Sequence, residues 1–191
     1  GDITTDNIIS SEAVTKAFLI SKQSGILAGI DVAKRVFQLL DKAVNFQCKV
    51  NDGAYIQKGD IIAEIEGNTS VLLKGERTAL NLLQRMSGIA TRTHEFVDKL
   101  QGLPSKIVDT RKTAPGLRLL DKYAVKVGGG SNHRFCLSDG VLIKDNHIAA
   151  AGGIKQAVEL ARNGIPHTIK IEVEVETMEQ VQEAIDSRAD I

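Results

Sequence analysis

The stretch "VLIKDNHIAAAGGIKQAVELARNGIPHTIKIEVEV", residues 141–175, decides the fold class of this chain. It opens with a short apolar run that ends in charged residues, which predicts a strand at 141–145. Residues 153–164 have the apolar spacing of an amphipathic helix, and residues 168–175 alternate apolar and charged side chains as a strand does. The order strand, helix, strand predicts two parallel strands joined by a helical crossover.

The same pattern continues on both sides of this stretch. Upstream, "KIVD" (106–109) predicts a strand and "GLRLLDKYAVKV" (116–127) predicts a helix, while downstream "MEQVQEAI" (178–185) predicts another helix. The closing residues "RADI" predict the start of a further strand, and we expect missing elements at both ends of the chain. Residues 104–191 are therefore predicted to form repeated β-α units with parallel strands covered by helices.

The N-terminal part, residues 1–103, is organised differently. Period-two alternation predicts strands at 14–20 and at 43–50, with a helix between them at 31–40 and a turn at Asn51, Asp52 and Gly53. This pattern is typical of an α+β layer. The sequence thus predicts two domains, with a boundary after residue 103.

A long helical pattern links the two predicted domains. Apolar residues recur at helical spacing in "GERTALNLLQRMSGIATRTHEFVDKLQG", residues 75–102. Gly88 lies near the middle of this segment and is predicted to kink or break the helix.

The composition excludes several classes of protein. The chain has 191 residues, of which 42% are hydrophobic, and its 24 Lys and Arg balance its 24 Asp and Glu, so no general positive field favours nucleic acid or an anionic membrane. No apolar run approaches the length of a membrane helix. Cys48 and Cys136 form no Cys-x-x-Cys pair, so we interpret them as buried thiols of a cytoplasmic protein and expect no zinc site.

Cations nevertheless gather in one region, between Asp109 and His147. The region contains seven Lys or Arg (residues 111, 112, 118, 122, 126, 134 and 144) against four Asp (residues 109, 121, 139 and 145). Several of them follow predicted strands, and ligands of parallel sheets bind at the carboxyl ends of strands. Arginine donates paired hydrogen bonds from a planar guanidinium, and lysine carries a compact mobile charge. A mixture of the two suits a small ligand with several anionic groups. Lys122 and Lys126, on the predicted helix, are expected to be solvated.

The strand at 168–175 carries acidic residues on one face. Glu172, Glu174 and Glu176 share that face with Lys170, while Ile171, Val173 and Val175 alternate with them and are predicted to face helices. Carboxylates this close together repel one another unless cations, a metal ion or hydroxyl donors accompany them. The acidic face therefore predicts a ligand on its side of the sheet.

Four motifs in fixed order, "GERTALNLLQRMSGIAT", "DTRKTAPGLR", "KYAVKVGGGSNHR" and "LIKDNH", closely resemble the quinolinate phosphoribosyltransferase family. The resemblance covers essentially the whole chain. It implies an α/β fold with an N-terminal α/β sandwich domain and an incomplete, truncated parallel α/β barrel, assembled as a homodimer or an oligomer of dimers. It also implies transfer of phosphoribose from phosphoribosyl pyrophosphate to quinolinate with decarboxylation, in NAD biosynthesis, with Mg²⁺ and no organic cofactor.

The resemblance also implies roles for particular residues. Arg77 would reach the neighbouring subunit's site, and Glu174 would serve the ribose and metal side, although Glu172 competes with it for that role. The cage for the pyridine dicarboxylate and the phosphates would consist of Thr110, Arg111, Lys112, His133, Arg134 and Lys144. Among these residues, Lys112, Lys144 and Glu174 are the expected catalytic ones. The family's later aspartate and phosphate loops fall beyond Ile191.

Other interpretations remain open at this point. His133 is expected to donate a hydrogen bond to the substrate, His147 to be structural, and the run Gly128–Gly130 to form a loop. A related protein of molybdenum transport, or a non-decarboxylating nicotinate phosphoribosyltransferase, would share the scaffold. Residues 51–67 resemble a biotinyl or lipoyl carrier hairpin but lack its Met-Lys-Met type site. A polyanion-binding barrel without activity is the last alternative.

Overall fold

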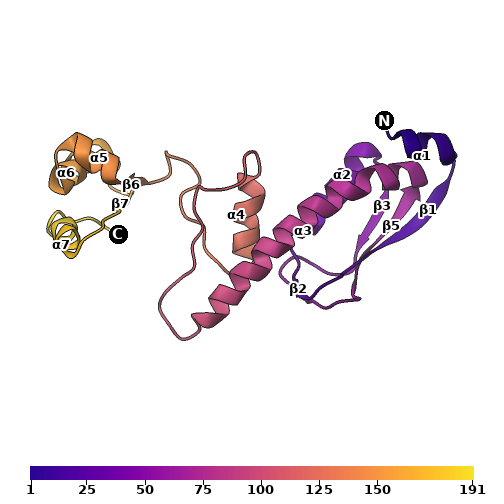
Figure 1. The fold of residues 1–191 in the computed structure, drawn as a ribbon, viewed down its shortest axis with the longest axis horizontal. Coiled ribbons are helices and arrows are strands. Elements are labelled where there is room, and N and C mark those ends of the chain that lie inside the picture. Colours follow the sequence, from indigo (N-terminus) through magenta and orange to yellow (C-terminus); the bar gives the residue numbers. More distant parts are fainter. The chain divides into compact units, whose positions relative to one another are not determined.

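The computed structural model describes all residues from 1 to 191 and has a mixed α/β fold. The chain forms two compact units, Gly1–His133 and Arg134–Ile191, whose elements are labelled in Figure 1. The predicted domain boundary after residue 103 stays a prediction.

The first unit contains an antiparallel sheet in the order β1-β5-β3 and a small pair, β2-β4. The predicted strands at 14–20 and 43–50 are confirmed. These strands are β1 (Val14–Ile20), β2 (Gly25–Ile26), β3 (Asn45–Cys48), β4 (Tyr55–Ile56) and β5 (Ile61–Asn68). A short helix, α1 (Ile3–Ile8), precedes the sheet and begins where the side chain of Asp2 accepts hydrogen bonds from the backbone.

Two helices, α2 (Ile30–Leu40) and α3 (Thr69–Lys99), pack against this sheet (Figure 1). Phe37 of α2 lies with its ring centroid 6.0 Å from that of Phe46 of β3, at the centre of the core. Ile65 of β5 and Leu72 of α3 are buried in the same cluster. Apolar burial of this kind supplies most of the stability of a small domain.

The helix α3 is continuous over 31 residues, so the predicted kink or break at Gly88 is wrong. Asn68 caps its start by accepting hydrogen bonds from the backbone N–H groups of Ser70 and Val71. One glycine in a helix interior costs about 1 kcal/mol relative to alanine, which packing along both halves of this helix offsets.

A further helix, α4 (Arg118–Val127), lies against the second half of α3 (Figure 1). Arg85 of α3 makes two hydrogen bonds of 2.8 Å to the carboxylate of Asp121, and Ala124 packs in one buried cluster with Met86 and Ala90. The hydrogen bond from Arg85 lowers the pKa of Asp121 below its usual value.

The glycine run after α4 supports the loop-forming interpretation. A Cβ on Gly128 would lie 2.3 Å from the carbonyl oxygen of Ala90, and Gly129 has a φ of +90°. The turn therefore needs glycine both for close packing on α3 and for its backbone conformation.

The turn at Asn51–Gly53 has a structural role beyond reversing the chain. The carboxylate of Asp52 accepts hydrogen bonds from the backbone N–H groups of Gly29 (2.8 Å) and Ile30 (3.0 Å), where α2 begins. It also accepts one from the hydroxyl of Tyr123 on α4, at 2.8 Å. Burial, followed by the bond to Asp52, raises the pKa of Tyr123 to about 12.

This contact predicts that the stability of the folded protein depends on pH in the alkaline range. The neutral phenol is the favoured form in the folded protein, so its contribution to stability is complete below the ordinary pKa of 10 and is lost as the pH rises through about 12. We expect the difference in tyrosinate absorbance between the wild type and Tyr123→Phe to develop near pH 12. A difference that develops near pH 10 would contradict the burial and the hydrogen bond.

The second unit contains a parallel pair of strands, β6 and β7, with Val141 opposite Ile171 and Ile143 opposite Val173. This pairing confirms the strand, helix, strand prediction for residues 141–175. Its elements are β6 (Val141–Ile143), α5 (Asp145–Ala151), α6 (Ile154–Gly164), β7 (Ile171–Val173) and α7 (Met178–Asp186). The helix α5 was not predicted from the sequence.

The predicted alternation along β7 is also confirmed. Ile171 is fully buried in a cluster with Ile154 and Val158 of α6, whereas Glu174, just past the strand, is exposed. Ile191 accepts a hydrogen bond from the backbone N–H of Val173 at 3.0 Å, in accordance with a strand beginning near "RADI".

Two further predictions concern the whole chain. None of its helices combines the length and the apolar character that crossing a bilayer requires. Both cysteines are free thiols, but the prediction that both are buried is wrong, since Cys48 is exposed and Cys136 half-buried. Cys48 lies at the end of an edge strand, where the alternation of the sheet no longer ensures burial.

Candidate active site

The "DTRK" segment lies beside the "SNH" segment, residues 131–133, in the first unit. Val108 and Ser131 form a parallel bridge, in which Ser131 N donates to Ile107 O at 2.8 Å and Asp109 N donates to Ser131 O at 3.2 Å. The strand predicted at 106–109 is thus reduced to this single bridge. The bridge brings the backbone that carries Thr110, Arg111 and Lys112 close to the backbone that carries His133.

A buried ion pair holds the two segments together. Lys122 donates from its ammonium to Asp109 Oδ1 and to the carbonyl oxygen of His133, the latter at 3.0 Å. Asp109 Oδ1 also accepts from the backbone N–H of His133 at 2.9 Å. In the amide orientation that satisfies its neighbours, Asn132 donates to Asp109 Oδ2 at 3.0 Å. All of these contacts lie within the first unit.

The prediction that Lys122 is solvated is therefore wrong. Only 2% of its surface is exposed, because the side chain is directed toward Asp109 and the backbone of His133 and not toward solvent. A buried ammonium is tolerated when an opposite charge and further acceptors surround it, as Asp109 and the carbonyl of His133 do here. Lys126, four residues later, is exposed as predicted.

Arg111 has an unused hydrogen-bond donor. Its Nε atom is buried and has no partner in the structure. The loop around it is nevertheless anchored, since Arg118 Nη2 donates to Arg111 O at 3.3 Å and Ala114 N donates to Asp121 at 3.2 Å. Most buried donors in proteins have an acceptor, so an unpaired one in an anchored loop indicates a place for an anionic or carbonyl oxygen.

The remaining predicted residues of the first unit are exposed to different degrees. Thr110 and Lys112 are exposed, with Lys112 N donating to Thr110 Oγ1 at 3.0 Å, and His133 is half-buried. Arg77 is exposed on α3 and forms no ion pair within the chain. Both Arg77 and Lys112 therefore keep cations available to a ligand or a partner.

In the second unit, Lys144 and Glu174 meet at the carboxyl ends of the two parallel strands. Each directly follows one of the paired residues Ile143 and Val173, and Lys144 Nζ lies 2.6 Å from Glu174 Oε2. Glu172 lies two residues before Glu174, within β7, where it is paired with Leu142. Glu174 thus lies at the strand end, the usual ligand position in parallel sheets, whereas Glu172 lies within β7.

Two other residues of the second unit have structural contacts. Arg134 donates from Nη1 to the carbonyl oxygen of Gly140 at 3.1 Å. His147 Nδ1 accepts from the backbone N–H of Lys144 at 3.0 Å, at the start of α5, which supports the structural interpretation of His147.

The predicted site residues thus fall into two sets. One set, Arg77, Thr110, Arg111, Lys112 and His133, belongs to the first unit, and the other, Arg134, Lys144 and Glu174, belongs to the second. The prediction that both sets form one cage stays a prediction.

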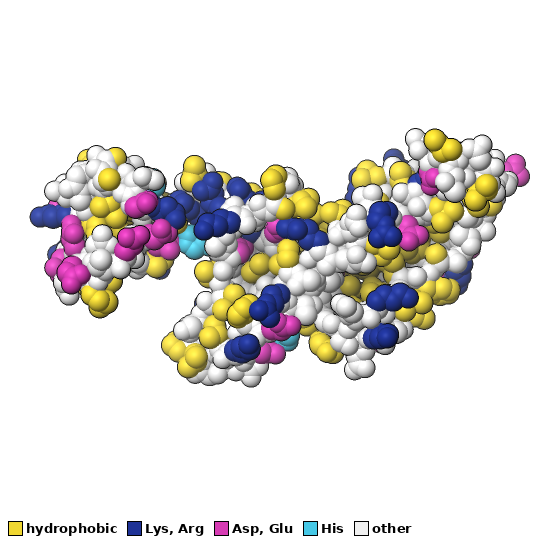
Figure 2. All heavy atoms as spheres, viewed as in Figure 1, with side chains coloured by type: hydrophobic (Ala, Val, Ile, Leu, Met, Phe, Trp, Pro, Cys, Tyr) yellow, Lys and Arg dark blue, Asp and Glu magenta, His cyan; other side chains and the backbone are white.

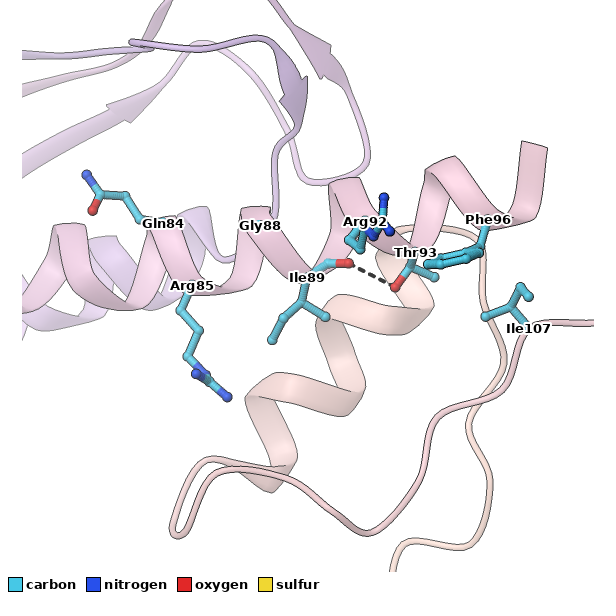
Figure 3. A pocket seen from close by; sticks show the side chains of 8 residues that line it. All are labelled: Gln84, Arg85, Gly88, Ile89, Arg92, Thr93, Phe96 and Ile107. Atoms are coloured by element: carbon cyan, nitrogen blue, oxygen red, sulfur yellow. Dashed lines mark hydrogen bonds between the residues drawn. The ribbon is translucent and has the colours of Figure 1, made fainter. Parts of the chain in front are cut away.

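A shallow hollow of about 580 Å³ along α3 is a poor anion site, although two arginines line it (Figure 3). Arg85 points toward α4, where Asp121 neutralises it, and Arg92 pairs with Glu95 at 2.5 Å while its guanidinium lies 4.6 Å from the ring centroid of Phe96. Cations that already have carboxylate partners attract a further anion weakly.

Sequence reasoning missed the ion pair that organises the first set. The sequence shows Asp109 as the charge directly after an apolar run, but the charge pattern predicts that Lys122 is a solvated surface lysine. The available signal was position, because Lys122 lies three residues before Val125 and so shares its helix stripe. No local pattern distinguishes a lysine that finds a buried carboxylate from one that faces solvent.

The described residues do not form a metal site of their own. No group of three or more His, Cys, Asp or Glu side chains lies close enough together to hold a metal ion. Magnesium in proteins keeps several waters and binds through one or two carboxylates plus substrate phosphates. The chain therefore shows no preformed cluster of ligands for a resident magnesium ion.

Comparisons with known proteins agree with this mixed α/β fold and identify its family. Residues 2–87 match the family model of the quinolinate phosphoribosyl transferase N-terminal domain, and residues 89–191 match that of the C-terminal domain. The chain therefore belongs to the quinolinate phosphoribosyl transferase family.

Individual relatives have names of the same kind. A probable nicotinate-nucleotide pyrophosphorylase (carboxylating) of Bacillus subtilis is 50% identical over 100% of this chain and 66% of its own length. A mitochondrial quinolinate phosphoribosyltransferase (decarboxylating) 2b of Nicotiana tabacum is 44% identical over 97% of this chain and 53% of its own length. The chain thus spans between half and two thirds of these relatives. Neither name favours molybdenum transport or a carrier module.

Solved structures give the same result. NadC from Streptococcus pyogenes superimposes with a TM-score of 0.93 at 46% identity, covering 99% of this chain and 67% of that one. The nicotinate-nucleotide pyrophosphorylase from Francisella tularensis has a TM-score of 0.93 at 41% identity, covering 100% and 67%. The enzyme from Pyrococcus furiosus, at 19% identity and a TM-score of 0.71, supports the fold alone.

Proposed function

We propose that the protein containing this chain transfers phosphoribose from phosphoribosyl pyrophosphate to quinolinate and decarboxylates the product to nicotinate mononucleotide. The observation that carries the proposal is the buried, unpartnered Nε of Arg111 in the "DTRK" loop, within a chain of this family. A guanidinium donor without a protein acceptor suits one carboxylate of a pyridine dicarboxylate, and Lys112 lies next to it in the sequence.

The first step forms a bond between the pyridine nitrogen and C1 of the ribose, while the bond from C1 to the pyrophosphate oxygen breaks. Positive charge develops on the sugar, and negative charge grows on the leaving group. Arg111 and His133 would hold the two ring carboxylates so that the nitrogen faces C1, which supplies orientation. Lys112 and Lys144 would stabilise the negative charge that moves onto pyrophosphate.

The second step removes a carboxylate from the alkylated ring. The ring nitrogen is then cationic, so the electron pair of the breaking carbon–carbon bond stays on the ring carbon as carbon dioxide leaves, and that carbon afterwards takes up a proton. The substrate itself provides the electron sink. No side-chain nucleophile is needed, and Glu174 would hold ribose hydroxyls or offset positive charge on the sugar.

For the architecture, we propose an N-terminal α/β sandwich over residues 1–103 and a truncated parallel α/β barrel over residues 104–191. The antiparallel sheet beneath α2 and α3 supports the first assignment. The parallel strands β6 and β7, joined through α5 and α6, support the second, because repeated units of this kind close into barrels.

We also propose a homodimer, or an oligomer of dimers, in which Arg77 reaches the neighbouring site. Arg77 is an exposed cation without a partner in the chain. Close to it, a groove of about 1020 Å³ is lined by side chains that include Phe18, Leu73, Glu76 and Leu80. Hydrophobic side chains gather on the visible face of this part of the molecule (Figure 2), and exposed apolar patches mark interfaces.

The last two parts of the proposal concern how magnesium reaches the active site and in which cellular compartment the protein lies. We propose that magnesium arrives bound to the phosphates of phosphoribosyl pyrophosphate, since the chain offers single carboxylates rather than a cluster. We place the protein in the cytoplasm, where free thiols such as Cys48 and Cys136 remain reduced.

The choice of acceptor tests the proposed function. The full-length protein, mixed with phosphoribosyl pyrophosphate, magnesium and quinolinate, is expected to release nicotinate mononucleotide and carbon dioxide. Nicotinate, which lacks one carboxylate, should be turned over at least about 100-fold more slowly, because a charge-assisted contact is lost. Liquid chromatography of the nucleotide product measures both rates, and equal rates would refute the dicarboxylate assignment.

A further inference from the structure

We propose that Lys122 and Asp109 are positioning residues, whose buried ion pair sets the substrate-binding geometry of Arg111 and His133 and thereby the selectivity for a dicarboxylate. This inference rests on the proposed function. Neither residue was among the predicted site residues, and neither needs to contact the substrate.

The pair acts on both sides of one residue. Asp109 Oδ1 accepts from the backbone N–H of His133 at 2.9 Å, and Lys122 Nζ donates to the carbonyl oxygen of the same residue at 3.0 Å. The two polar groups of the His133 backbone are thus fixed by two charges that also bind each other. The direction in which the imidazole leaves the chain is set by this backbone.

The same pair fixes the start of the "DTRK" loop. Asp109 is joined to Ser131 through its backbone N–H at 3.2 Å, and its carboxylate accepts from Asn132 at 3.0 Å in the amide orientation that satisfies both residues. Arg111 follows only two residues later, and its own guanidinium has no protein partner that would orient it. The position of the Arg111 backbone relative to His133 therefore depends on Asp109.

A general role in holding α4 does not explain the arrangement. The bidentate contact between Arg85 and Asp121 and the apolar cluster around Ala124 already attach α4 to α3. Lys122 is instead directed at the loops, and its side-chain exposure of 2% with 7% for Asp109 leaves no solvent to replace either partner. If Arg111 and His133 bind the same substrate, a small change in their relative position is enough to weaken binding of that substrate severely.

The decisive measurement is the selectivity of the enzyme for quinolinate over nicotinate, with both substrates tested on the same sample of protein. We expect Lys122→Met in the full-length protein to lower the ratio of kcat/KM for quinolinate to kcat/KM for nicotinate by about 10- to 100-fold, the range of one charge-assisted contact. The ratio is independent of the fraction of protein that is folded, so a loss of stability alone does not move it. Asp109→Asn keeps the shape of the side chain and should lower the ratio as well.

Tyr123→Phe is the matched control, since it removes a hydrogen bond from the neighbouring residue of the same helix without touching the loops. It should lower thermal stability and leave the ratio within about twofold. An unchanged ratio in both Lys122→Met and Asp109→Asn would overturn the inference. If Lys122→Met does not fold, the result for Asp109→Asn decides. A wild type inactive toward quinolinate would refute the proposed function itself, and the inference with it.

Discussion

Replacing Arg111 with alanine in the full-length protein is expected to lower kcat/KM for quinolinate at least about 100-fold, with little change in thermal stability. Its guanidinium forms no ion pair in the chain, and its Nε is buried without a partner, so removal deprives the fold of no side-chain hydrogen bond or ion pair. The loss in activity equals at least about 2.7 kcal/mol of transition-state stabilisation, at 1.36 kcal/mol for each factor of ten. Steady-state kinetics and thermal melts measure the two effects.

Two further variants sharpen this result. Arg111→Lys keeps the positive charge but loses the bidentate hydrogen bonding of the guanidinium, so an intermediate loss of activity is expected. Lys126→Ala removes an exposed cation from the end of α4 and should leave kcat/KM within about twofold, since exposed charges act weakly through solvent. Parallel losses of stability and activity in Arg111→Ala would indicate that the residue is structural.

Replacing Gly128 with alanine is expected to destabilise the protein by about 1–3 kcal/mol, the usual effect of overpacking. The new methyl group would meet the carbonyl oxygen of Ala90 at 2.3 Å, and the side chain of Thr93 at 2.8 Å. Because Ala90 O is backbone inside α3, relief requires the turn after α4 to move. Thermal denaturation of the full-length protein measures the change.

Gly88 offers the matched control on the helix itself. A Cβ there would meet no heavy atom within 4 Å, and α3 is regular through this position. Gly88→Ala should therefore raise the free energy of unfolding by about 0.5–1 kcal/mol, through higher helix propensity. A destabilised Gly88→Ala together with a neutral Gly128→Ala would contradict the packing of α4 on α3.

Regular elements were predictable where periodicity was strong. The helix at 153–164 and the strand at 168–175 were found because their apolar residues face one cluster, in which Ile154 and Ile171 are almost completely buried. The short strands and α5 were harder to predict, since three residues of strand or about two turns of helix carry little periodicity. The break predicted at Gly88 failed because tertiary packing overrides the preference of a single residue.

The candidate site was predictable as a set of residue types and not as a geometry. Motif resemblance supplied Arg111, His133 and Lys144, whereas the contact between Lys144 and Glu174 at the strand ends is visible only in the structure. The contacts of Lys122 were beyond sequence reasoning, because they depend on where a distant loop returns. The unsatisfied Nε of Arg111 likewise becomes visible only when every neighbouring acceptor is placed.

The carboxylate of Asp52 has a consequence for local motion. It receives hydrogen bonds from the first turn of α2 and from Tyr123 of α4, so one surface turn braces two helices that are far apart in the sequence. Opening that turn removes a hydrogen-bonded contact from both helices at once. The first turn of α2 and the middle of α4 are therefore coupled through one side chain, although the residues between them include β3, β4, β5 and the whole of α3.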